Sequence, residues 1–252
     1  MTMQGQTSDA VRFAPGYEKI RPGANYAPWL TDADFRKIHA QIEGHTLVDV
    51  YRCYSLWKLV EQAVLVEGDL LEVGVWRGGT GALIASALER RSRFGQSDRA
   101  TEAIGRQELP DGSRCVFLAD TFTGVAKAGP RDSYYRGGEH ANTSREVVEE
   151  LLGRVGASSA ILLEGVFPED TGDLIDDHRF SFCHIDVDVY QSARDTFEWV
   201  WPRLNVGGIV VYDDYGFYGC EGVTSHVNEI FPDPRRMVIH NLNGQAVVVK
   251  TS

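Results

Sequence analysis

Hydrophobic residues gather in short runs along this chain, separated by stretches in which they recur every three or four residues. The short runs predict buried strands: one begins at Asp69, and the others span 116–120, 160–163, 180–188 and 208–212. The stretches between them predict helices, such as residues 49–66, 144–155 and 190–204. Two last runs, 237–240 and 246–250, predict a terminal hairpin. Alternating strands and helices predict an α/β fold with a mainly parallel sheet and an antiparallel hairpin at its end.

The N-terminal part shows less regular patterning. Residues 1 to about 30 are polar and interrupted by Pro-Gly pairs, so we expect an arm rather than a packed element. Thr31 precedes an amphipathic segment that reaches about Ile42, which predicts a capped helix. We therefore divide the chain into an N-terminal arm and helix, residues 1–45, and a main domain, residues 46–252. Residues 91–113 are polar and charged, and we expect a surface loop there.

Aspartates follow the last two predicted strands of the parallel sheet. Asp186 and Asp188 are two residues apart, a spacing that puts both side chains on one face of an extended chain. Asp213 and Asp214 are adjacent, so they can serve one site only if their strand has ended. If the two strands are parallel neighbours, roughly 4.8 Å apart, the four carboxylates converge at the carboxyl edge of the sheet. Open α/β sheets bind their ligands at that edge.

These four carboxylates predict a divalent-metal site. Neither run contains Lys or Arg, so the acids would repel one another without a cation between them. Asp186, Asp213 and Asp214 would provide oxygen ligands, which suit Mg²⁺, Mn²⁺ or Ca²⁺ better than Zn²⁺. Helix capping after each strand is the alternative, and it explains one aspartate per strand more easily than four.

A glycine-containing turn after the first strand indicates a second ligand. The pattern Glu72-x-Gly74-x-x-x-Gly78 lets a ligand approach the backbone and presents helix N–H groups, although it is not the GxGxxG dinucleotide pattern. Asp120 ends the second strand and is the acceptor that a ribose diol needs, unless it is a helix cap or a solvated loop acid. The two features in this order predict a cofactor that contains a nucleoside.

Several other residues have a functional and an ordinary interpretation. The long glycine-rich loop 121–142 is of a length typical of functional lids, and His140 in it could reach a substrate or lie on the surface. His184 lies inside a strand, and we expect an ordinary core histidine there. Four aromatic residues could line a pocket or be scattered on the surface: Tyr26, Trp29, Tyr134 and Tyr135.

Composition narrows the classes of partner. A net charge of −11 argues against nucleic acid or an anionic membrane surface as the main partner. The four cysteines are scattered without a CxxC pair, so we expect reduced thiols rather than disulfides or zinc ligands. We find no secretory signal and no apolar run long enough to cross a bilayer. We therefore expect a cytoplasmic protein without nucleic-acid or membrane partners.

Four motifs carry a resemblance to a known family. They are Leu71-Glu72-Val73-Gly74-Val75-Trp76-Arg77-Gly78-Gly79, Ala119-Asp120-Thr121-Phe122, Ile185-Asp186-Val187-Asp188-Val189-Tyr190 and Tyr212-Asp213-Asp214-Tyr215. From about His45 to about Ile230 the chain resembles the macrocin O-methyltransferase (TylF-type) family. The resemblance implies a Rossmann-like class I methyltransferase fold, and S-adenosyl-L-methionine and Mg²⁺ (or Mn²⁺) as cofactors. It also implies methylation of a sugar hydroxyl in a glycosylated natural product.

The resemblance also implies roles for individual residues. Glu72 and Gly74 would line the cofactor pocket, and Asp120 would hold the ribose. The metal ligands would be Asp186, Asp213 and Asp214, with Asp188 as the general base, although some members use a histidine. We expect a small-molecule glycoside as substrate and a homo-oligomer. Two alternatives remain at this point: methylation of a catechol-type phenol, and a non-catalytic module that binds the cofactor or a metal.

Overall fold

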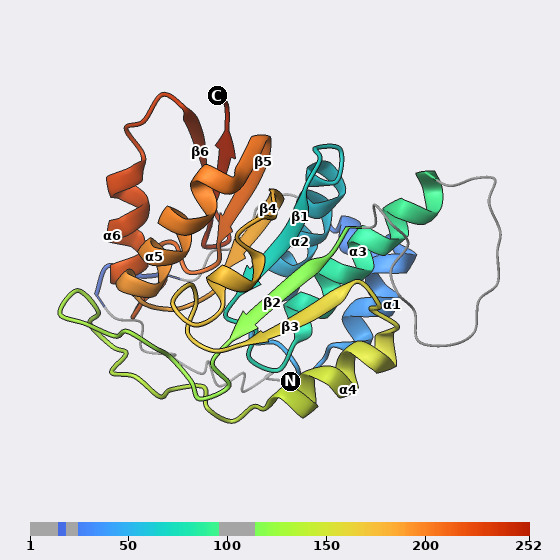
Figure 1. Cartoon of the computed structure of the whole chain (residues 1–252), viewed down its shortest axis with the longest axis horizontal. Helices are drawn as coiled ribbons and strands as arrows, with labels where there is room; N and C mark the ends of the chain where they lie inside the picture. The colour runs from blue at the N-terminus through green and yellow to red at the C-terminus, as the bar shows by residue number, and fades with distance from the viewer. Residues whose placement is uncertain (1–14, 19–24, 96–113) are drawn as a thin grey trace, which may run out of the picture.

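A seven-stranded sheet forms the centre of the molecule (Figure 1). The computed structural model describes residues 15–18, 25–95 and 114–252. Its strands, in spatial order, are β3 (Ala160–Glu164), β2 (Val116–Asp120), β1 (Asp69–Val73), β4 (Phe180–Ile185), β5 (Leu204–Tyr212), β7 (Gln245–Lys250) and β6 (Arg236–Asn241). The first five strands pair in parallel, and β7 pairs antiparallel with both β5 and β6. The predicted parallel sheet with a terminal hairpin is confirmed.

Helices cover both faces of this sheet. They are α1 (Ala33–Gln41), α2 (Val50–Ala63), α3 (Gly79–Gly95), α4 (Arg145–Val155), α5 (Tyr190–Val200) and α6 (Glu221–Ile230), with short 3₁₀ helices η1 (Pro28–Leu30), η2 (Gly172–Ile175) and η3 (Trp201–Arg203). Neighbouring strand residues alternate between two apolar cores. Leu70 packs with residues of α1 to α4, and Leu71 packs with residues of α5 and α6. The strands are therefore buried on both faces, as their continuous apolar runs predict.

The order of the strands fixes where a ligand can bind. From β1 the chain moves outward through β2 and β3, and then returns to place β4 on the other side of β1. Such a reversal leaves a crevice outside the carboxyl ends of the strands on either side of it. Here those ends are Val73 of β1 and Ile185 of β4, which are register partners.

The N-terminal region differs from the expectation in two respects. The side chain that caps α1 is Asp32 rather than Thr31, because Asp32 Oδ1 accepts a hydrogen bond of 3.0 Å from the Phe35 amide. The described parts of the expected arm are also packed: the Trp29 ring lies 4.9 Å from the Tyr51 ring. Tyr17 donates a hydrogen bond of 2.8 Å to Glu221 at the start of α6. The described parts of the arm therefore pack on the main domain and form a hydrogen bond with it. The domain boundary at residue 45 stays a prediction.

Of the two predicted loops, one begins as a helix and the other has the expected irregular structure. Helix α3 continues to Gly95, so the first part of segment 91–113 is helical rather than a loop, and residues 96–113 lie outside the described residues. Segment 121–142, between β2 and α4, contains neither helix nor strand, as predicted. All four cysteines are free thiols, which also agrees with the prediction.

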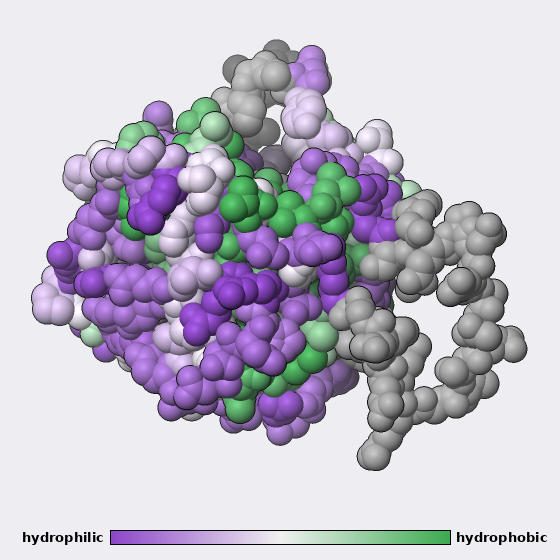
Figure 2. All heavy atoms as spheres, turned by 45° about the horizontal axis from the view of Figure 1, so that its top comes forward, coloured by the Kyte–Doolittle hydropathy of each residue, from purple (hydrophilic) through white to green (hydrophobic). Residues whose placement is uncertain are grey.

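The surface is mainly hydrophilic on the face shown in Figure 2, where hydrophobic residues form separate patches. Among the described residues, no helix combines the length and the apolar composition needed to cross a membrane.

Candidate active site

A cavity opens at the carboxyl edge of the parallel strands. Its walls come from the segments that follow all five parallel strands, from loop 121–142, and from residues 45–52 before and at the start of α2. The predicted site residues that line it are Gly74, Asp120, Asp186, Asp188, Asp213 and Asp214. Glu72 is the exception: its side chain is fully buried, and it is absent from the cavity lining.

Gly74 brings the turn after β1 against the backbone that follows β4. Its φ is +91°, a value that favours glycine. A Cβ atom at this position would lie 1.7 Å from the carbonyl oxygen of Asp186. Only a residue without a side chain therefore allows this approach between the two segments that the sequence assigns to cofactor and metal.

Asp120 organises the same turn from the neighbouring strand. Its Oδ2 accepts hydrogen bonds from the amides of Val75 (2.7 Å) and Trp76 (2.8 Å), and its Oδ1 accepts one from Phe122 (2.7 Å). A carboxylate can accept about four hydrogen bonds. Asp120 thus fixes the glycine turn and keeps room for one further donor, such as a hydroxyl group.

The predicted acids form two neighbouring groups rather than one. His184, Asp186 and Asp213 bring possible metal-binding atoms within 4.8 Å of one another, and Asp188, Asp214 and Cys220 form a second group by the same distance. The expectation that Asp186 and Asp188 share one strand face is wrong. Strand β4 ends at Ile185, and Asp188 has a φ of +64°, so the chain is no longer extended there.

Asp213 has buried partners from three distant elements. Arg52 of α2 donates to Oδ2, and Gln245 of β7 donates to Oδ1 at 2.8 Å. Burial by itself would raise the pKa of Asp213, but the neighbouring His184 and the charge of Arg52 lower it below 3.8. Arg52 is a site residue that no sequence motif predicted. Its position on the buried face of α2, four residues before Leu56, was the available signal, because a buried arginine needs an acid.

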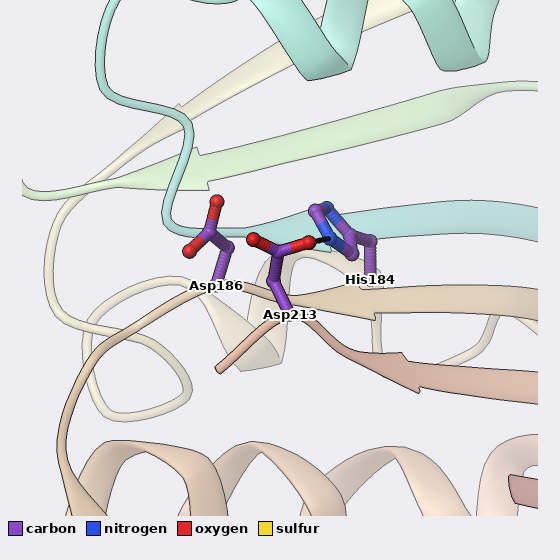
Figure 3. A group of neighbouring side chains, drawn as sticks. All are labelled: His184, Asp186 and Asp213. Carbon is purple, nitrogen blue, oxygen red and sulfur yellow. Dashed lines mark ion pairs between the residues drawn. The ribbon is translucent and has the colours of Figure 1, made fainter. Parts of the chain in front are cut away.

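His184 and Glu72 lie beneath the first group of acids. They are register partners on β4 and β1, and His184 Nδ1 lies 2.9 Å from Glu72 Oε1. The other ring nitrogen, Nε2, lies 3.5 Å from Asp213 Oδ1, and Figure 3 shows the ring facing Asp213 with Asp186 beyond it. Burial would lower the pKa of His184, but Asp213 and Glu72 raise it to about 10. His184 is buried as expected, yet it contacts the candidate site.

Asp188 faces two side chains of loop 121–142. His140 Nε2 lies 4.0 Å from Asp188 Oδ2 and 3.5 Å from the Tyr135 hydroxyl oxygen. The Asp188 amide donates to Asp214 Oδ2 at 3.1 Å. Of the aromatic residues suggested by the sequence, Tyr135 lines the cavity, whereas Tyr26, Trp29 and Tyr134 are absent from its lining.

The electrostatics of the site fit a cation. Burial raises the pKa of Asp186 and of Asp214 well above 3.8, and the charges of neighbouring aspartates raise both further. Burial also raises the pKa of Asp188, against the opposing effects of Tyr135 and His140. Within the described part of the chain, none of these three acids forms an ion pair with Lys or Arg. A bound cation or added protons must therefore compensate the negative charge of these three acids.

Sequence comparisons show the family. Residues 33–230 match the family described as Macrocin-O-methyltransferase (TylF), so the match begins before residue 45. The chain is 29% identical over 188 residues to the 8-demethyl-8-(2,3-dimethoxy-alpha-L-rhamnosyl)-tetracenomycin-C 4'-O-methyltransferase of Streptomyces olivaceus, covering 70% of this chain and 65% of that protein. It is 30% identical over 183 residues to the demethyldecarbamoylnovobiocin O-methyltransferase of Streptomyces niveus, covering 68% and 63%. These matches span just under two thirds of each relative's length.

A solved structure shares the fold. The O-methyltransferase NovP aligns with a TM-score of 0.65 at 24% identity, and the alignment covers 82% of this chain and 83% of NovP. The strand order and this likeness confirm the predicted Rossmann-like class I methyltransferase fold. With a family match that covers most of its length, the chain belongs to the macrocin O-methyltransferase (TylF) family.

Proposed function

We propose that this protein is an S-adenosyl-L-methionine- and divalent-metal-dependent O-methyltransferase that acts on a sugar hydroxyl of a glycosylated natural product. One observation carries the proposal: the glycine turn at Gly74 and the acids after β4 and β5 line the same cavity. Methyl transfer needs these two ligand sites side by side, because the sulfonium methyl group and the acceptor hydroxyl must meet in line. Such alignment supplies roughly 7–11 kcal/mol of the barrier reduction.

The cofactor would bind across the carboxyl ends of β1 and β2. Gly74 leaves space against the backbone, and Asp120 has the capacity to accept one ribose hydroxyl. Glu72 does not line this part of the cavity; its side chain contacts His184 beneath the acids instead.

The metal ligands would be Asp186, Asp213 and Asp214. All three line the cavity. The raised pKa values of Asp186 and Asp214 are consistent with acids whose charge a bound cation would compensate. A bound Mg²⁺ or Mn²⁺ would lower the pKa of the acceptor hydroxyl.

Asp188 would act as the general base. The Asp188 carboxylate would take the proton of the sugar hydroxyl as the hydroxyl oxygen bonds to the methyl group. S-adenosyl-L-methionine, when bound, would supply that methyl group, and the electron pair of the broken carbon–sulfur bond would stay on sulfur, so that S-adenosylhomocysteine is the leaving group. The position of Asp188 at the cavity wall, with Tyr135 and His140 around it, supports this role. A positioned base adds about 10²–10⁴-fold to the rate.

The acceptor would lie between loop 121–142 and the segment after β5. Tyr135, Phe217 and Tyr218 line that part of the cavity, and aromatic surfaces suit the rings of a sugar or an aglycone. The name of the Streptomyces olivaceus relative includes a rhamnosyl compound, which supports a glycoside rather than a simple phenol as the acceptor.

The Asp188→Asn variant tests the base. Its carboxamide keeps the size of the side chain but cannot take the proton, so turnover of a glycoside should fall about 10²–10⁴-fold. Isothermal titration should give the same affinity for S-adenosylhomocysteine as in the wild type. Unchanged turnover would remove Asp188 from the mechanism.

A second titration tests both ligand sites. Wild-type protein treated with EDTA should bind S-adenosylhomocysteine and Mg²⁺, and Asp213→Ala should lose the metal while still binding the cofactor. A wild type that binds no S-adenosylhomocysteine would contradict the proposed function as a whole.

A further inference from the structure

His184 is a buried histidine that lies between two carboxylates. It has no exposed surface, and its two ring nitrogens face different carboxylates. Nδ1 is within hydrogen-bond distance of Glu72 Oε1 at 2.9 Å, and a carboxylate can only accept there, so this nitrogen carries the hydrogen. Glu72 is also fully buried, and its strand lies directly beside β4. The orientation of the ring is therefore fixed from behind.

The other nitrogen of His184 points toward the candidate metal site. Nε2 is buried and has no hydrogen-bond partner among the described residues. It lies 3.5 Å from Asp213 Oδ1, and Asp186 completes a group whose possible metal-binding atoms are within 4.8 Å of one another (Figure 3). In the neutral ring, Nε2 and the facing carboxylate oxygen each present a lone pair. A positive centre between them is needed to make that arrangement favourable.

A carboxylate behind a histidine is the usual support of a metal ligand. Histidines that bind metals donate their second N–H to a carboxylate or carbonyl, which fixes the tautomer and turns the free nitrogen toward the ion. Glu72 and His184 show this arrangement, with Asp186 and Asp213 as oxygen ligands on the far side of Nε2.

We propose that His184 Nε2 is a ligand of the metal ion, with Glu72 as its supporting carboxylate. The inference rests on the metal site of the proposed function and adds a nitrogen to its oxygen ligands. Imidazole nitrogen favours first-row transition metals, whereas Mg²⁺ and Ca²⁺ prefer oxygen ligands throughout. The site is thereby assigned to Mn²⁺ or a similar transition-metal ion in preference to Mg²⁺.

Pulsed EPR of the Mn²⁺-loaded full-length protein tests this directly. After EDTA treatment and addition of Mn²⁺, the spectrum should show electron spin-echo modulation from a directly bound ¹⁴N nucleus. Protein made with ¹⁵N-histidine should give the corresponding ¹⁵N modulation. Because this measurement needs no substitution, it stays decisive if a variant at the buried position fails to fold.

Two histidine variants assign the signal to a residue. His184→Asn should lose the nitrogen modulation and bind Mn²⁺ at least tenfold more weakly, so that its preference over Mg²⁺ disappears. His140→Asn is the matched control, because His140 lines the same cavity on its outer side and should leave the modulation unchanged. Loss of the signal in His140→Asn alone would overturn the assignment.

The Glu72→Gln variant separates two roles for Glu72. Loss of a supporting carboxylate weakens metal binding about 10–100-fold, so the Mn²⁺ dissociation constant should rise by that factor. The affinity for S-adenosylhomocysteine should stay within twofold of the wild type, since Glu72 lies outside the cavity lining. A fall in cofactor affinity with unchanged Mn²⁺ binding would instead return Glu72 to the cofactor pocket and overturn its proposed role.

The outcomes distinguish this inference from the proposed function. Mn²⁺ bound through oxygens only, without nitrogen modulation, would overturn the inference and leave a proton on His184 as the positive centre. The metal-dependent methyltransferase would then still stand. If neither Mn²⁺ nor Mg²⁺ bound, both the inference and the metal dependence would fail, while cofactor binding would still be tested by titration.

Discussion

At the scale of single residues, the site depends on side chains whose space and partners are tightly defined. The Asp186 carbonyl occupies the space that a Cβ atom at Gly74 would need, and Asp120 accepts hydrogen bonds from the next two amides of the same turn. Two backbone segments that would serve different ligands therefore touch at one glycine. A change at this residue should affect both binding and folding.

We expect Gly74→Ala to lower the affinity for S-adenosylhomocysteine at least tenfold and to destabilise the protein by more than the roughly 1 kcal/mol that a strained φ costs. The clash is with backbone, which cannot rotate away. Titration and chemical denaturation measure the two effects. Gly138→Ala is the matched control: its φ is +86°, but a Cβ there would meet nothing within 4 Å, so the cofactor affinity should stay within twofold. Equal losses in both variants would contradict the steric argument.

At the scale of elements, a buried acid, Asp132, links loop 121–142 to α5, alongside a hydrogen bond from Ser192 to Ala126 and an ion pair between Lys127 and Asp195. Asp132 is only 6% exposed; its Oδ1 accepts from the Tyr190 amide at 2.8 Å, and its Oδ2 accepts from the Gly129 amide at 2.8 Å. The N-cap residue of α5, Val189, makes no capping hydrogen bond with its side chain. Asp132 caps the helix instead, from a distant segment. The cap also fixes the loop that presents Tyr135 and His140 to Asp188.

Asp132→Ala should therefore destabilise the protein by about 1–3 kcal/mol, because the buried amide of Tyr190 and the partly buried amide of Gly129 lose their acceptor. Hydrogen exchange should accelerate in loop 121–142 and at the start of α5, and the KM for the acceptor should rise more than kcat falls. Asp132→Asn keeps one acceptor oxygen and should be intermediate. Glu150→Ala, at an exposed position of α4, should change none of these quantities. Unchanged exchange in the loop of Asp132→Ala would show that other contacts hold it.

At the scale of the whole molecule, the cavity collects negative charge from several elements. Asp186 and Asp188 follow β4, Asp213 and Asp214 follow β5, and Glu72 of β1 lies buried beneath them. Arg52 is drawn in from α2 to pair with Asp213. Concentrating these acids in one place costs stability in the absence of a cation, because buried charges of one sign repel one another. The clustered acids therefore lower the stability of the metal-free folded state.

The metal-free protein should lose stability as the pH rises from about 5 to 9. The pKa values of Asp186 and Asp214 are raised above 3.8, so the folded state holds protons that the unfolded chain has lost, and their contribution falls as the pH rises through the folded values. His184 acts in the same direction: its contribution is complete below 6.5 and is lost through about pH 10. Asp213, with a lowered pKa, loses its contribution only under more acidic conditions. His226, whose pKa is lowered to about 4 by burial, opposes the trend up to about pH 6.5, so the loss of stability should be clearest above that pH.

Denaturation in EDTA at pH 5, 7 and 9 measures this slope, which is about 1.4 kcal/mol per pH unit for each extra proton held by the folded state. Saturating Mg²⁺ or Mn²⁺ should flatten it, because the ion replaces the protons. Asp214→Asn should reduce the slope in EDTA, since it removes one of the titrating acids. A metal-free protein that becomes more stable over this range would contradict the electrostatic description of the site.

Local patterns along the chain were enough to predict the fold and the location of the cavity. Apolar alternation is local, and parallel strands end at a common edge, so Gly74, Asp120, Asp186, Asp213 and Asp214 could be assigned to one cavity from their positions after predicted strands. The same local rules predicted the terminal hairpin and the structureless loop 121–142.

Which side chains face one another in the site depends on how distant elements pack. Arg52 and Gln245 are 161 and 32 residues away from Asp213, and nothing local links them. The packing of α2 on the sheet and the pairing of β7 with β5 bring them there. The chain is not extended at Asp188, where φ is positive, so the spacing of Asp186 and Asp188 did not predict how the acids group. The register of β1 against β4 placed Glu72 behind His184. Periodicity along the chain fixes which face a residue takes, whereas its partner across the interior is set by how whole elements pack.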